Sequence, residues 1–203
     1  SGKYRLYAFS LNNDWHQSGA NLMTILDKVF IAVSLLWLLE LFLFRNRKKE
    51  PSPLEERQSF YWILATLLTT ILFSVLFSDS LRFPLSREIG LLFLTSGVAL
   101  RYWGIYHLKH QFTRHVTVNP GDRLVSTGPY RALRHPLYTG LFFITLGFPL
   151  YFGNLLVALC AGVLMFIALL HRIRIEERML TEGFGPAYTD WARRRKRLIP
   201  FIY

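Results

Sequence analysis

Uncharged stretches of membrane length recur along the chain. Residues 60–77 contain no charged side chain, and neither do residues 137–170, where Pro149 and the Gly153–Asn154 pair are the interruptions. A helix needs about 20 apolar residues to cross the hydrocarbon core of a bilayer. A buried helix in a soluble domain would explain one such stretch, but it does not explain the set. The pattern therefore predicts an all-α integral membrane protein.

The same pattern gives the number of spans. We expect five transmembrane helices, at Val29–Phe44, Phe60–Phe77, Ile89–Tyr106, Leu137–Phe152 and Leu155–Leu170. A short break separates the last two, which should form a tight hairpin. Both are shorter than a full span, so the pair is expected to run close to the turn or to reach only part-way into a thinned bilayer. An amphipathic helix should follow them at the C-terminal end.

Composition agrees with a membrane location and adds an orientation. The chain is 52% hydrophobic and 16% aromatic, with a net charge of +11. Most lysines and arginines flank one end of the predicted spans, which places the N-terminus outside and the C-terminus in the cytoplasm. Anionic lipid headgroups account for this charge more simply than a nucleic-acid partner. The single cysteine, Cys160, excludes an internal disulfide and a cysteine metal site.

Two charged residues fall inside predicted spans, where an unpaired charge is costly. They are Glu40 in the first span and Arg101 in the third. Either the two pair with each other or extend to the membrane surface, or Arg101 lines a functional cavity. Between the first two spans, the Ser-Pro-Leu-Glu sequence of residues 52–55 predicts a capping box that opens a short helix.

Three histidines in the long segment 106–135 raise the question of a metal site. His107 and His110 are spaced to share a helical face, and His115 follows them. No carboxylate or thiolate completes a recognisable ligand set. We therefore expect no metal, and histidines that lie near lipid headgroups.

Candidate chemistry concentrates where the fourth span begins. Arg131, Arg134 and His135 stand with two tyrosines directly before the apolar stretch that starts at Leu137. Pro136 suits the first turn of a helix, where its missing N–H is not needed. The unpaired amides of such a turn attract anions. The segment therefore predicts a binding site at the border between water and lipid.

A second charged segment follows the last span. Arg172 and Glu176 are four residues apart and share a helical face, as do Arg174 and Arg178. Ordinary ion pairs on a solvated helix would explain this stretch by itself. Because it should leave the same hairpin on the same side as residues 128–140, the two segments are expected to meet.

Several ordered motifs resemble a known family. They are Leu124-Val125, Gly128-Pro129-Tyr130-Arg131, Arg134-His135-Pro136-x-Tyr138-x-Gly140, the run from Arg172 to Glu177, Phe184-Gly185-x-x-Tyr188, and Arg197-Leu198-Ile199-Pro200-Phe201. In a membrane context, their order and spacing resemble the isoprenylcysteine carboxyl methyltransferases and the related integral-membrane phospholipid methyltransferases. The resemblance covers about half of the chain, from Gly97 onward.

This resemblance implies methyl transfer from S-adenosylmethionine and a set of site residues. Residues 1–106 would hold the N-terminal segment and first three spans, and residues 107–203 the cofactor-binding region. The cofactor would be bound by Arg123, Leu124, Val125, Tyr130, His135, Pro136, Leu137, Tyr138 and Glu176, and the catalytic residues would be Arg172 and Glu176, with Arg172 contacting the acceptor. The family commonly has histidine where this chain has Asp122, so Arg123 is a contact of uncertain kind.

The sequence leaves open which chemical class of acceptor would receive the methyl group. A prenylated cysteine carboxylate needs only a cation such as Arg172 to orient it, whereas a phospholipid amine needs a base such as His135 or Glu177. A small lipophilic thiol would need a cation that favours the thiolate. The non-enzyme alternative is a lipid-binding membrane scaffold. The expected location is a bacterial inner membrane or the endoplasmic reticulum, with the active site facing the cytoplasm.

Overall fold

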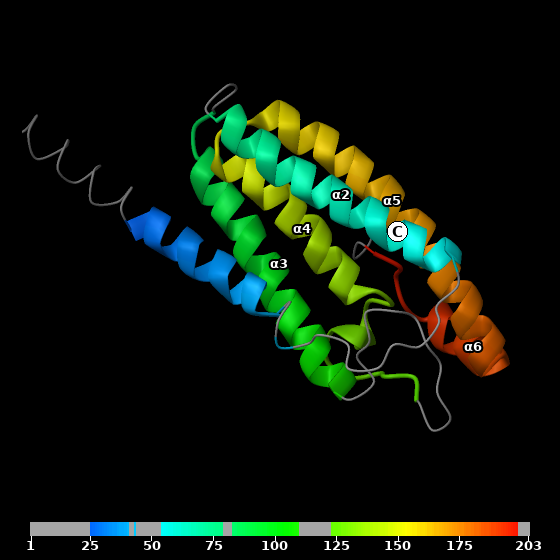
Figure 1. Ribbon diagram of the computed structural model, residues 1–203. Helices are drawn as coiled ribbons and strands as arrows, with labels where there is room; N and C mark the ends of the chain where they lie inside the picture. The colour runs from blue at the N-terminus through cyan, green and yellow to red at the C-terminus, as the bar shows by residue number, and fades with distance from the viewer. Residues whose placement is uncertain (1–24, 41–42, 44–53, 79–82, 110–122, 199–203) are drawn as a thin grey trace, which may run out of the picture.

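The computed structural model describes residues 25–40, 43, 54–78, 83–109 and 123–198, which are mainly helical (Figure 1). In chain order the elements are a helix of residues 25–40, α2 (Leu54–Leu76), α3 (Ser86–Leu108), the 3₁₀ helix η2 (Gly128–Arg131), α4 (Pro136–Tyr151), α5 (Leu155–Phe184) and α6 (Pro186–Arg193). Within these described ranges, the only β pairing is an isolated bridge between Leu133 and Lys196.

The described residues of all five predicted apolar segments lie on helices, apart from Phe77 and Phe152 just past two helix ends, and the protein is an integral membrane protein. Helices α2, α3 and α5 are long and apolar enough to cross a membrane, whereas α4 has 16 residues and is shorter. Large apolar side chains stay exposed along their outer faces, for example Leu68 on α2 and Leu159 on α5. Such exposure suits a lipid environment, where burial of apolar groups inside the protein has no special advantage.

Two expected boundaries were wrong. The span predicted to end at Leu170 continues to Phe184, so the charged stretch belongs to α5 itself. Charged residues end an apolar pattern without breaking a helix. Helix α5 is capped by Gly185, whose φ of 58° favours glycine and whose N–H donates to Thr181 O. Likewise, the short helix expected after residue 52 is the first turn of α2, which begins at Leu54; Ser52 lies outside the described residues.

Glycines bring α3 and α4 into close contact. A Cβ added to Gly97 would lie 2.6 Å from the carbonyl oxygen of Gly140 on α4, closer than real contacts allow. Small residues at helix crossings let the two backbones approach and pack in a membrane. The helix of residues 25–40 lies along α3, with Tyr102 donating to Leu36 O at 2.7 Å (Figure 1). This packing fixes the position of α4, which begins at the candidate site.

The polar segments gather at one end of the bundle. After α6 the chain returns to the start of α4, where Arg134 N–H donates to Lys196 O at 2.7 Å and His135 N–H to Arg197 O at 3.2 Å. The Thr139 hydroxyl on α4 also donates to Leu198 O. In Figure 1, η2, the start of α4, the end of α5 and α6 all lie at this end. Segments more than 50 residues apart in sequence thus surround the first turn of α4.

Candidate active site

His135 lies at the centre of the site, directly before the first turn of α4. It is 4% exposed, and its ring stacks on Tyr138 with a centroid distance of 5.7 Å. Two consecutive carboxylates of α5 flank it: Nδ1 lies 3.8 Å from Glu176 Oε1, and Nε2 lies 3.4 Å from Glu177 Oε1. The expected meeting of the two charged segments is therefore present in the structure.

Glu177 is fully engaged by neighbouring cations. Arg134 donates to its Oε1 at 2.9 Å, and Arg197 lies 3.0 Å from its Oε2. The uncharged part of α5 ends at Leu170, so Glu177 lies beyond the membrane-spanning part. Burial acts to raise the pKa of Glu177, but His135 and the two arginines outweigh it and lower this pKa to about 2. Glu177 is thus an ionised, structural carboxylate that positions His135.

Glu176 has a different environment from its neighbour. Its Oε2 is buried and has no hydrogen-bond partner among the described residues. Leaving a buried carboxylate oxygen unpaired costs about 1–3 kcal/mol or more. The hydroxyl of Tyr188 on α6 is likewise buried without a partner in this part of the chain, and burial followed by the charges of Glu177 and Glu176 raises the pKa of Tyr188. Both groups are available to a ligand that donates hydrogen bonds or carries positive charge.

Arg172 is held in place by α2. Its Nη2 donates to Glu56 Oε1 at 2.8 Å, its Nη1 donates to Ser59 Oγ at 3.0 Å, and its Nε donates to the Tyr138 hydroxyl at 2.9 Å. Arg172 is 3% exposed and Glu56 is fully buried. The guanidinium also lies 5.9 Å from the centre of the Phe60 ring. Arg172 therefore has a fixed orientation beside the His135–Tyr138 stack.

Glu56 and Ser59 were missed by the sequence analysis, although α2 carries a signal. Its buried residues are Glu56, Ser59, Ile63, Leu67, Thr70 and Ser74, at spacings of three and four. Such spacing defines one face of a helix, and here the face mixes small and polar residues within an otherwise apolar sequence. That stripe indicates which face of α2 meets α5.

The remaining predicted cofactor residues lie in the segment from residue 123 to the first turn of α4. Tyr130 in η2 is buried, and burial followed by the charge of Glu176 raises its pKa. Val125 is half-buried, and its carbonyl oxygen accepts a hydrogen bond from Trp191 Nε1 of α6 at 3.1 Å. Leu124 is half-buried beside it, whereas Arg123 is exposed. Pro136 is buried and Leu137 half-buried in the first turn of α4. The place of all these residues in a cofactor site, Arg123 included, stays a prediction.

The two charges inside the membrane region pair with each other. Arg101 Nε donates to Glu40 Oε2 at 2.8 Å, and Glu40 is 2% exposed. Arg101 Nη1 also donates to Leu137 O at 3.0 Å, which anchors the first turn of α4. The pairing hypothesis is thus confirmed. Among the described residues no group of three potential metal ligands occurs; His110 and His115 lie outside them.

Part of the chain matches the model of a known protein family. Residues 89–182 match the model of the isoprenylcysteine carboxyl methyltransferase (ICMT) family. The resemblance to that family is confirmed. The matched residues run from α3 to the end of α5 and include His135, Arg172 and Glu176.

Individual proteins similar to this chain have names that agree with the family match. Protein-S-isoprenylcysteine O-methyltransferase of Saccharomyces cerevisiae is 33% identical over 144 residues, which cover 69% of this chain and 60% of the relative. Protein-S-isoprenylcysteine O-methyltransferase B of Arabidopsis thaliana is 29% identical over 117 residues, covering 57% and 59%. A solved structure of a eukaryotic intramembrane Ras methyltransferase of this family matches with a TM-score of 0.55 and 27% identity, covering 72% and 53%. The chain thus spans about 60% of these two curated relatives and about half of the solved chain.

Proposed function

We propose that this protein is an integral membrane methyltransferase that uses S-adenosylmethionine and esterifies a lipophilic carboxylate, most like protein-S-isoprenylcysteine O-methyltransferase. One observation carries the proposal: the buried, unpartnered Oε2 of Glu176, which lies on the carboxylate that flanks His135 at the start of α4. The family match and the named relatives support the reaction class. Phospholipid amines and small lipophilic amines or thiols are the alternative acceptors.

The residues at the site fit this methyl donor. A site for S-adenosylmethionine must accept a sulfonium, an ammonium, a carboxylate and an adenosine. Glu176 offers negative charge for the cationic part. In the first turn of α4, Pro136 has no N–H and the Tyr138 and Thr139 N–H groups donate to His135 O, so the Leu137 N–H is the amide that would receive a carboxylate. Tyr130 and Tyr138 offer aromatic surfaces near Glu176. Leu124 and Val125, tethered to α6 through Trp191, would form the apolar wall for the adenine.

Arg172 has the properties needed to orient the acceptor. When bound, S-adenosylmethionine supplies a methyl group on sulfur that a nucleophile displaces in line. A carboxylate nucleophile is already ionised, so the protein has to position it and exclude water. The Arg172 guanidinium is pre-oriented by Glu56, Ser59 and Tyr138, and such fixed charges lose little entropy when an acceptor binds.

The low pKa of Glu177 supports a carboxylate acceptor over an amine acceptor. An amine must lose a proton, and a general base works best when its pKa lies near the working pH. Arg134, Arg197 and the hydrogen bond with His135 hold the pKa of Glu177 at about 2, so it is a poor proton acceptor at neutral pH. This leaves His135 as the base that an amine acceptor would require, and His135 is already flanked by two carboxylates.

The proposal includes a membrane topology. Five spans would consist of the helix of residues 25–40, α2, α3 and an α4–α5 hairpin joined by residues 152–154. The site would then lie at the cytoplasmic end, where the basic residues gather. A lipophilic acceptor would enter from the bilayer and the methyl donor from the cytoplasm of a bacterium or the cytosolic side of the endoplasmic reticulum.

A binding titration with matched variants tests the proposal. S-adenosylhomocysteine titrated calorimetrically into the purified full chain should bind saturably. Glu176→Gln should weaken binding by about tenfold or more, since a charge-assisted hydrogen bond contributes about 1.5–3 kcal/mol. Glu182→Gln, an exposed change on the same helix, should leave the affinity unchanged.

Labelled methyl transfer on the same sample then identifies the acceptor. N-acetyl-farnesylcysteine should become labelled, and phosphatidylethanolamine should not. Folded protein without saturable binding would overturn the enzyme proposal in favour of a membrane scaffold. Binding with label on the amine lipid alone would retain the methyltransferase and refute the carboxylate.

A further inference from the structure

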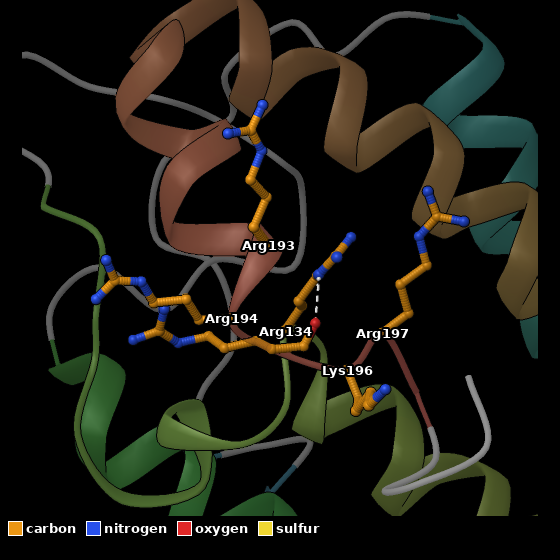
Figure 2. Close-up of a pocket in the computed structure, with 6 residues that line it drawn as sticks. Arg134, Arg193, Arg194, Lys196 and Arg197 are labelled. Carbon is orange, nitrogen blue, oxygen red and sulfur yellow. Dashed lines mark hydrogen bonds between the residues drawn. The ribbon is translucent and has the colours of Figure 1, made fainter.

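A dense cluster of cations lies outside the methyltransferase site. The basic turn, residues 193–197 with the sequence Arg-Arg-Arg-Lys-Arg, begins at the last residue of α6. Together with Arg134 it lines an open pocket of about 400 Å³. Figure 2 shows the side chains of Arg193, Arg194 and Arg197 spreading from the turn, with Arg134 reaching it from the segment before α4.

Backbone and aromatic contacts hold this turn in shape. Lys196 pairs with Leu133 in an isolated bridge, and its N–H donates to Ala132 O at 2.9 Å. Arg134 Nε donates to the carbonyl oxygen of Arg195 at 3.0 Å (Figure 2). It also donates to Ala192 O at 3.0 Å. The Arg195 guanidinium lies 4.4 Å from the centre of the Trp191 ring. The cations are therefore fixed close together by contacts that do not neutralise them.

Few carboxylates compensate this charge. Glu177 is shared by Arg134 and Arg197, and Asp190 lies 3.6 Å from Arg193 with both side chains about three-quarters exposed. In the described part of the chain, Arg194 and Lys196 form no ion pair. Burial is the main cause that lowers the pKa of Arg195, and the positive charge of Arg194 adds to it, because like charges this close repel each other. A bound anion would relieve this repulsion.

The position of the pocket indicates the source of the anion. The basic turn pairs with residues 132–135, directly before Pro136, and the apolar part of α4 begins at Leu137. An apolar membrane helix starts at the level where lipid headgroups end, so the cations lie at headgroup depth. Anionic phospholipids present their phosphates at this level, and basic residues near the membrane surface each contribute about 1 kcal/mol, a factor of about five in affinity.

We propose that the basic turn and Arg134 form a binding site for the phosphate-bearing headgroup of an anionic phospholipid. This site is separate from the acceptor site at Arg172 and does not depend on the proposed methyltransferase activity. It would hold the end of α6 and the start of α4 at the membrane surface. Free phosphate compounds share the same chemistry, and the experiment separates the two sources.

Lipid binding to the purified full chain provides the test. Short-chain phosphatidylglycerol, phosphatidylcholine and inorganic diphosphate are titrated separately into protein in a non-ionic detergent, and bound ligand is counted by native mass spectrometry. Phosphatidylglycerol should bind saturably and at least about tenfold more tightly than the other two. The double variant Arg194→Gln/Lys196→Gln should weaken it by about 25-fold, five-fold for each lost cation.

Matched variants test whether lipid binding depends on the basic turn or on surface charge in general. Arg57→Gln/Arg174→Gln removes two exposed charges at the same end of the bundle and should change affinity less than twofold. Arg194→Lys/Lys196→Arg keeps the charge and should retain binding; it also serves if the glutamine variant does not fold. Equal weakening by both glutamine pairs would overturn a defined site in favour of diffuse charge. Diphosphate binding as tightly as the lipid, with the same dependence on Arg194 and Lys196, would overturn the lipid assignment.

Discussion

Replacing Glu56 by Gln tests the buried contact that orients Arg172. The substitution keeps the size of the side chain and removes its charge. Glu56 is fully buried and Arg172 is 3% exposed, so the guanidinium would lose its buried counter-charge where solvent cannot compensate. Breaking a buried ion pair on one side typically costs about 3–5 kcal/mol.

The adjacent residue supplies a matched control. Glu55 also faces an arginine of α5, with its Oε2 3.7 Å from Arg178 Nη1, but the two side chains are 68% and 65% exposed. An exposed pair of this kind contributes about 0–1 kcal/mol. Glu55→Gln should therefore leave stability nearly unchanged while making the same chemical change one position earlier on the same helix.

Two measurements separate stability from positioning. Thermal unfolding of the purified protein in one detergent should show a clear loss of stability for Glu56→Gln and little for Glu55→Gln. Among the molecules that remain folded, Glu56→Gln should raise the KM for the carboxylate acceptor, because Glu56 accepts a hydrogen bond from Arg172. The affinity for S-adenosylhomocysteine should stay within about twofold, because Glu176 on α5 is the carboxylate assigned to the cofactor. Equal stability of the two variants would refute the energetic argument, and an unchanged acceptor KM would refute the positioning role.

Three further predictions follow from the described contacts. Gly97→Ala should destabilise the protein by about 1–3 kcal/mol in thermal unfolding, since the new methyl group meets Gly140 O at 2.6 Å; normal stability would mean that α3 and α4 separate easily. Arg172→Ala should spare cofactor affinity and impair acceptor turnover, and retained turnover would remove Arg172 from the acceptor site. Because the pKa of Glu177 falls from 4.5 to about 2 on folding, its contribution to stability is present above about pH 5 and is lost as the pH falls toward 2. In Glu177→Gln, the stability measured by unfolding should therefore fall less between about pH 5 and pH 2. The same fall as in the unchanged protein would contradict the lowered pKa of Glu177.

Local patterns were sufficient to predict the helices and the centre of the site. Long, mainly apolar stretches identified the apolar helices, and Pro136 marked the start of α4. The spacing of Arg172 and Glu176 placed both on one face of α5, which does reach the His135 segment. These features depend on helix periodicity and on the cost of charge in lipid, which act on neighbouring residues and can be recognised in a sequence.

The partners of those residues were decided by packing between distant segments. Nothing near Arg172 in the sequence indicates that Glu56, more than 100 residues earlier, neutralises it. The different states of Glu176 and Glu177 likewise depend on which neighbours fold against each of them. A charge acquires its environment from every element around it, and that environment exists only after the helices have packed. The sequence alone determined which residues are candidates for the chemistry, and the tertiary structure decided which of them remain available to a ligand.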